Sequence, residues 1–99
     1  MRRGTTPTHK FTTDVDLTSA VVLYVTYTQG AKTIIEHDID DCEIAADYIQ
    51  TQLTQEETLK VADKSSVKIQ IRARLADGEA VASNIMSASP EEILKDGVI

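Results

Sequence analysis

The segment VKIQIRARL (67–75) constrains the fold more than any other part of this chain. Apolar and polar residues alternate along it with a period of two, as in a β-strand that buries one face. The outward face carries Lys68, Arg72 and Arg74. The inward face is expected to hold Val67, Ile69, Ile71, Ala73 and Leu75. The segment therefore predicts a long amphipathic strand.

A β-hairpin is expected to follow this strand. A two-residue turn at Asp77 and Gly78 would place apolar side chains on the polar face of the returning strand. A three-residue loop that ends in a left-handed Gly78 instead pairs Ala73 with Val81. The same register pairs Ile69 with Ile85. The second register is the prediction, because it keeps the apolar residues of both strands on one face.

Other segments also have strand patterns. Residues 21–28 (VVLYVTYT) carry no charge on either face, which indicates an interior strand, and residues 32–36 return from it after Gly30 as a hairpin. Residues 8–13 predict a short edge strand, and residues 48–53 alternate as a half-buried strand does. One face of the segment 21–28 holds Val21, Leu23, Val25 and Tyr27, and the other face holds Val22, Tyr24, Thr26 and Thr28.

Short helices are expected at two places. Thr54 and Glu57 have the spacing of a capping box, which predicts a helix over about 55–60. Ser89 as an N-cap and Pro90 at the first helical position predict a turn or two of helix over 90–96. The acidic segment 37–47 has no clear period, and the pattern leaves open whether it is a loop or a short helical turn.

The order of these elements predicts a mainly β fold, an antiparallel β-sandwich of about six strands with one or two short helical turns. The capped helix before the long strand is similar to the crossover of immunoglobulin-like sandwiches. Ninety-nine residues suffice for one domain. We expect residues 1–7 to be a flexible N-terminal arm and residues 8–99 to form a single domain with a C-terminal tail.

Composition narrows the function classes. The net charge of -6 argues against nonspecific binding to nucleic acid, and the few aromatic residues argue against a surface for stacking sugars or bases. Cys42 is the single cysteine, which favours a reducing compartment. The sequence has neither a signal-peptide pattern nor a long apolar run. We therefore expect a soluble protein of the cell interior, or one assembled there, without contact to membranes.

Metal binding and catalysis have weak candidates. Asp38, Asp40, Asp41 and Glu43 offer carboxylates to a cation, but they lack the glycine and the final glutamate of an EF-hand loop. His37 and Cys42 do not have the spacing of a zinc site. With two histidines, no nucleophile elbow and no glycine-rich phosphate loop, the chain is expected not to be an enzyme and to need no cofactor.

Lys68, Arg72 and Arg74 are the clearest candidate binding residues. Their most direct interpretation is the solvated face of a sheet, since no aromatic residue is interleaved with them. If they bind anything, we expect a protein before a nucleic acid. Val98 and Ile99 are apolar at the end of the sequence, and we expect them to contact a protein partner or another copy of the chain.

Several segments together resemble a group of small uncharacterised phage and prophage proteins of Gram-positive, largely clostridial, bacteria. They are MRRGTTPT, YVTYTQG, LTQEETL, RARLADGEAVASNI and EILKDGVI. The resemblance covers most of the chain apart from residues 37–47, and it implies a phage structural protein of the head–tail or tail region, or an accessory protein. We therefore expect a non-enzymatic interaction module in the cytoplasm of a host bacterium or in a virion. The alternative is a module that binds carbohydrate or protein through loops at one end of the sandwich.

Overall fold

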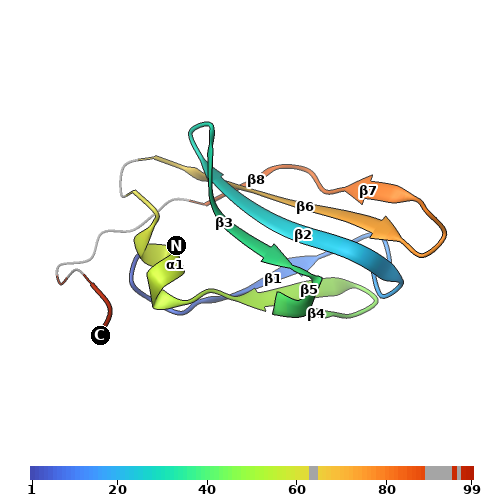
Figure 1. Ribbon diagram of the computed structural model, residues 1–99, viewed down its shortest axis with the longest axis horizontal. Helices are drawn as coiled ribbons and strands as arrows, with labels where there is room; N and C mark the ends of the chain where they lie inside the picture. Colours follow the sequence, from blue (N-terminus) through green and yellow to red (C-terminus); the bar gives the residue numbers. More distant parts are fainter. Residues whose placement is uncertain (63–64, 89–94, 96) are drawn as a thin grey trace.

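The computed structural model describes residues 1–62, 65–88, 95 and 97–99 (Figure 1). These residues form a mainly β structure with two short helices. The strands are β1 (Thr8–Thr12), β2 (Ala20–Gln29), β3 (Lys32–Asp38), β4 (Cys42–Ile44), β5 (Tyr48–Gln52), β6 (Val67–Leu75), β7 (Ala80–Ala82) and β8 (Met86–Ala88). The helices are the 3-10 turn η1 (Ile39–Asp41) and the α-helix α1 (Gln55–Leu59).

The strands form two antiparallel sheets that pack against each other. One sheet has the order β1-β5-β4, and the other has the order β3-β2-β6-β7, with β8 also paired to β6. This order corresponds to strands B-E-D and C′-C-F-G of an immunoglobulin sandwich, with α1 at the crossover from E to F. Strand A, which would lie beside β1, has no counterpart among the described residues.

The five-stranded sheet confirms the predicted alternation of residues 67–75. All five inward-facing residues of β6 are buried, and Lys68, Arg72 and Arg74 are exposed. Strand β2 lies between β3 and β6, as its uncharged faces predict. Val21 does not share the buried face of β2 with Leu23 and Val25, because the pairing of β2 with β6 shifts by one residue between Ala20 and Val22. The shift turns Val21 outward, and its side chain is exposed.

The hairpin after β6 confirms only part of the predicted register. Ala73 pairs with Val81, and Gly78 has a φ of 90°, so the expected loop is present. Ser83 continues the pairing with β6, because its N–H donates to the carbonyl of Ile71 at 2.8 Å. One extra residue follows, so that Ile69 pairs with Met86 and not with Ile85. A one-residue shift turns the following side chains to the opposite face of the sheet, and Ile85 is therefore exposed.

Capping boxes define both helices. Thr54 Oγ1 accepts from the Glu57 N–H at 3.1 Å, while Glu57 Oε1 accepts from the Thr54 N–H at 2.9 Å. This reciprocal pair confirms the predicted capping box, and α1 follows it. In the segment 37–47, Asp38 and Asp41 form a second capping box around η1, which is followed by β4. The segment that the pattern left undecided thus contains both a helical turn and a strand.

The N-terminal segment lies against the body of the protein, where its composition predicts a flexible arm. The Arg3 guanidinium donates to the carbonyls of Val61 at 2.6 Å and Leu59 at 3.1 Å, just after α1. Thr5 and Thr58 exchange hydrogen bonds through the Thr58 hydroxyl. These bonds satisfy carbonyls at the end of the short helix. The helix predicted for residues 90–96 falls almost entirely outside the described residues.

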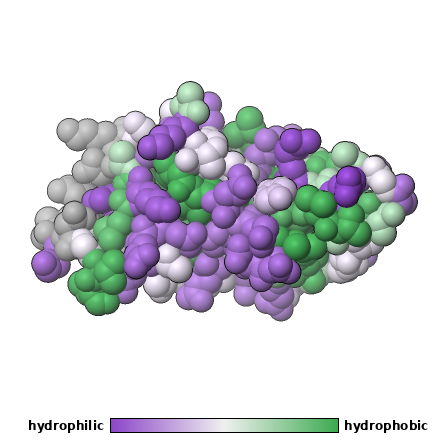
Figure 2. Space-filling view, in the orientation of Figure 1, coloured by the Kyte–Doolittle hydropathy of each residue, from purple (hydrophilic) through white to green (hydrophobic). Residues whose placement is uncertain are grey.

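The core lies between the sheets and is almost entirely aliphatic. Leu23, Val25, Ile49, Leu53 and Val67 are each at most 1% exposed. Tyr27 is the one aromatic side chain among the fully buried ones of the described residues. The edge formed by β3, η1 and β4 is polar, and Figure 2 shows a hydrophilic surface over β3 and β4. The opposite edge, along β1, β7 and β8, holds the candidate site.

Candidate functional site

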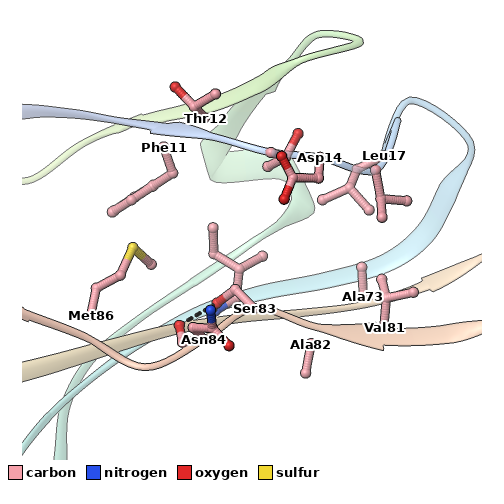
Figure 3. Close-up of a pocket in the computed structure, with 13 residues that line it drawn as sticks. Phe11, Thr12, Asp14, Leu17, Ala73, Val81, Ala82, Ser83, Asn84 and Met86 are labelled. Carbon is pink, nitrogen blue, oxygen red and sulfur yellow. Dashed lines mark hydrogen bonds between the residues drawn. The ribbon is translucent and has the colours of Figure 1, made fainter.

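A groove lined by both apolar and polar residues opens between the two sheets beside β1 (Figure 3). Its volume is about 430 Å³. Phe11 of β1 and Met86 of β8 face each other across one end, and Leu17 lies across from Val81 near the other. The lining comprises Phe11, Thr12, Thr13, Asp14, Val15, Leu17, Ile71, Ala73, Val81, Ala82, Ser83, Asn84 and Met86. We call this space the β1 groove.

The sequence produces the β1 groove in two ways. On the side of the five-stranded sheet, Ala73 and Ser83 are small, so that this wall does not reach the opposite sheet. On the other side, β1 is the edge of its sheet, and the chain from Thr13 to Leu17 crosses from one sheet to the other. The space that remains is the place where an immunoglobulin sandwich has its strand A.

The chemistry of the β1 groove is that of a binding surface. Asp14 is the one ionisable side chain in its lining. The Thr13 hydroxyl oxygen is buried and has no hydrogen-bond partner in the described part of the chain. Burying a hydroxyl without a partner is unfavourable, so this group costs the folded protein some stability. Apolar walls with a few polar groups are typical of surfaces that bind other molecules.

The free edge of β1 runs along this groove. The Thr13 N–H donates to the Asp47 carbonyl and the Leu53 N–H donates to the Pro7 carbonyl, so the odd-numbered residues of β1 bond to β5. Hydrogen bonds of an antiparallel strand alternate between its two sides. The backbone groups of Thr8, Lys10 and Thr12 therefore point away from β5. No described residue pairs with this edge.

The predicted basic residues lie elsewhere, on the outer face of the five-stranded sheet. Arg72 lies cross-strand from Tyr24, and Arg74 from Val22. Tyr24 is 43% exposed, so an aromatic ring does stand beside Arg72, contrary to the sequence interpretation. Lys68, Arg72 and Arg74 form no ion pair with any carboxylate of the described residues. We call Tyr24, Lys68, Arg72 and Arg74 the basic face.

The predicted C-terminal residues are separate from both surfaces. Val98 and Ile99 are 58% and 87% exposed, and Figure 1 shows the C-terminus at the α1 end of the molecule. The Gln55 side chain accepts from the Ile99 N–H at 2.7 Å and donates to an Ile99 oxygen at 3.2 Å. Val98 lies over a shallow depression formed mainly by residues 52–56. The structure therefore does not bring the predicted binding residues together.

The acidic residues around η1 have local structural roles. Asp38 Oδ1 accepts from the Asp40 N–H at 3.0 Å, and Asp41 Oδ2 accepts from the Asp38 N–H at 3.1 Å. Glu43 accepts from the Gln50 amide at 3.3 Å. No three His, Cys, Asp or Glu side chains come together as metal ligands in the described ranges. Capping of the helical turn accounts for the orientation of Asp38 and Asp41.

A buried polar network lies between the sheets, and no motif in the sequence indicates it. His37 bonds through Nδ1 to the Thr51 hydroxyl and through Nε2 to Glu57 Oε2, both at 2.6 Å. His9 Nδ1 lies 2.7 Å from the Tyr27 hydroxyl. A hydroxyl, a histidine and a carboxylate in series resemble a nucleophile with its base. Thr51 is only 2% exposed and His37 6%, so no substrate reaches them. The network is structural.

The environment of this network shifts the pKa values of three groups. Burial lowers the pKa of His9 below its ordinary value of 6.5, and the N-terminal ammonium group and His37 add to the effect. Burial also raises the pKa of the Tyr27 hydroxyl and of the Cys42 thiol. All three shifts favour the neutral form, as burial in an apolar interior does.

Comparison of the chain with models of protein families, with curated protein sequences and with solved structures finds no match. No helix in the described part of the chain has the length and apolar character needed to cross a bilayer. The site must therefore be interpreted from its own geometry.

Proposed function

We propose that this chain is a non-enzymatic interaction module that binds a protein partner through the β1 groove. The observation that carries the proposal is the groove itself, a space of about 430 Å³ lined by apolar and polar residues, beside a strand edge that no described residue pairs with. Apolar side chains of a partner would leave water there, which favours binding by about 25 cal/mol for each Å² buried. His37 is held in the buried network, and His9, on β1, is not among the residues that line the groove.

We further propose that the protein is a structural or accessory component of a phage or prophage, in the host cytoplasm or in the virion. The resemblance to small phage proteins supports this context, and small β domains that present strand edges suit assembly with neighbours. The genes that flank the coding sequence test it. Terminase, capsid or tail genes would support a phage role, and housekeeping genes would contradict it.

The basic face is a second candidate contact. Tyrosine and arginine are enriched where protein interfaces concentrate their binding energy, and here they stand side by side and exposed. An acidic protein surface fits three cations that have no carboxylate partner among the described residues. If this face is the primary contact, Arg72→Glu will abolish partner binding and changes in the β1 groove will not.

A matched pair of variants tests the β1 groove. Val15 lines the groove and is 45% exposed, whereas Val21 is 53% exposed and lies outside it. We expect Val15→Glu to abolish binding of a partner purified from the phage-producing host, and Val21→Glu to leave it unchanged. Both proteins should remain folded, because each charge is added at an exposed position. Equal binding by the two variants, measured by calorimetry with purified components, would contradict the proposal.

A further inference from the structure

We infer that the β1 groove accepts an extended segment of a partner protein as an added β-strand, with apolar side chains entering the groove and a carboxylate beside Lys10. This inference rests on the proposed function and specifies the partner. Proteins that recognise peptides by strand addition obtain affinity from backbone hydrogen bonds and specificity from alternate side chains. Each of these two requirements is met along β1.

The backbone requirement is met by Thr8, Lys10 and Thr12. Their N–H and C=O groups point away from β5, and no described residue pairs with them. Three residues at alternate positions give a row of donors and acceptors of the kind that an edge strand offers to another chain. A segment of about five residues would pair with this row.

The side-chain requirement is met by the two faces of β1. His9 and Phe11 are half-buried and face inward, and Lys10 is exposed on the outer face. Side chains of an added strand opposite His9 and Phe11 would point the same way, toward the groove walls formed by Leu17 and Met86.

The charge of the partner follows from Lys10. Its ammonium nitrogen lies 4.3 Å from the centre of the Tyr48 ring, and it forms no ion pair with a described carboxylate. The residue of an added strand opposite Lys10 shares its face of the sheet. An Asp or Glu at that position would lie beside the ammonium group. The partner segment therefore alternates apolar residues around a central acid.

A second copy of this chain fits the groove poorly. Pairing two β1 edges antiparallel about Lys10 would place one lysine directly opposite the other, which is unfavourable. The other edge of the molecule carries the exposed carboxylates Asp38, Asp40 and Glu43, and Figure 2 shows it as hydrophilic. On that edge β4 offers Glu43 between Cys42 and Ile44, but β4 is three residues long and would cover only part of the five-residue edge of β1. A strand from a different protein is the better occupant.

The test uses the full chain, labelled with ¹⁵N, and a synthetic blocked peptide in which valines alternate with threonines around a central glutamate. Binding should slow hydrogen exchange at the amides of Thr8, Lys10 and Thr12. The amides of His9 and Phe11 already face β5 and should change little, which provides an internal control. A peptide with lysine in place of the glutamate should bind about five-fold more weakly. The variant Lys10→Glu should reverse that preference.

The outcomes separate this inference from the proposed function. Slower exchange at these three amides, together with the reversed preference of Lys10→Glu, supports strand addition. Peptide binding without slower exchange there, or without a charge preference, overturns it, and so does the absence of binding at millimolar peptide. Slower exchange at the same amides that depends on protein concentration alone would identify a second copy as the occupant and overturn the choice of partner. None of these outcomes decides the proposed function. That function is tested separately, by comparing the binding of the partner to Val15→Glu and to Val21→Glu.

Discussion

Replacing Glu57 by alanine tests whether the buried network stabilises the fold by joining α1 to the five-stranded sheet. Glu57 Oε1 completes the cap of α1, and Oε2 bonds to His37 Nε2 on β3 at 2.6 Å. Loss of the cap contact costs about 1 kcal/mol. The His37 ring is 6% exposed, and an unsatisfied buried ring nitrogen costs about 1–3 kcal/mol more. We therefore expect Glu57→Ala to lower the free energy of unfolding by about 2–4 kcal/mol.

Two neighbouring substitutions serve as controls. Thr54→Ala removes the cap but leaves the bond to His37, and it should cost about 1 kcal/mol. Glu56→Ala alters an exposed residue of the same turn, and it should change stability by less than about 0.5 kcal/mol. Urea unfolding at pH 7, followed by circular dichroism, measures all three. If Glu57→Ala costs no more than Thr54→Ala, the bond between Glu57 and His37 does not stabilise the fold.

Three further predictions concern single groups. In the folded protein the pKa of His9 lies below 6.5, so His9 takes up a proton more readily in the unfolded chain. The free energy of unfolding should therefore fall as the pH falls through about 6.5. His9→Gln should make this pH dependence smaller in urea unfolding, and an unchanged profile would refute the assignment. Burial raises the pKa of the Cys42 thiol, so iodoacetamide should modify it slowly at pH 7.5 and much faster in urea, whereas equal rates would contradict its burial. Gly78 has a φ of 90° with open space around it, so Gly78→Ala should cost about 1–2 kcal/mol through backbone strain alone, and Gly78→Asn should cost less in the same assay.

Local patterns predicted the local structure well. The alternation of residues 67–75 gave the buried and exposed faces of β6, and the spacing of Thr54 and Glu57 gave the start of α1. Both depend on residues that are near one another in the chain. The predictions for Val21 and Ile85 were wrong because each depends on where a one-residue bulge falls, and the apolar pattern does not reveal a bulge.

The features formed by distant residues were not predictable in this way. His37 meets Thr51 and Glu57 only because β3, β5 and α1 converge between the sheets. The β1 groove depends on Ala73, Ser83 and Leu17, which are unremarkable in the sequence and leave a space only after the sheets pack. Tyr24 stands beside Arg72 through the register of β2 with β6. The folded N-terminal segment likewise depends on carbonyls some 56 and 58 residues away.

Photo-crosslinking from defined positions tests the central claim most directly. A photoreactive residue at Thr12, on the rim of the β1 groove, is compared with one at Tyr24, on the basic face. Each is expressed in the phage-producing host and activated during assembly. We predict that position 12 crosslinks to an extended acidic segment of one partner protein and that position 24 does not. Crosslinks to that partner from position 24 alone would place the interaction on the other sheet and contradict the account.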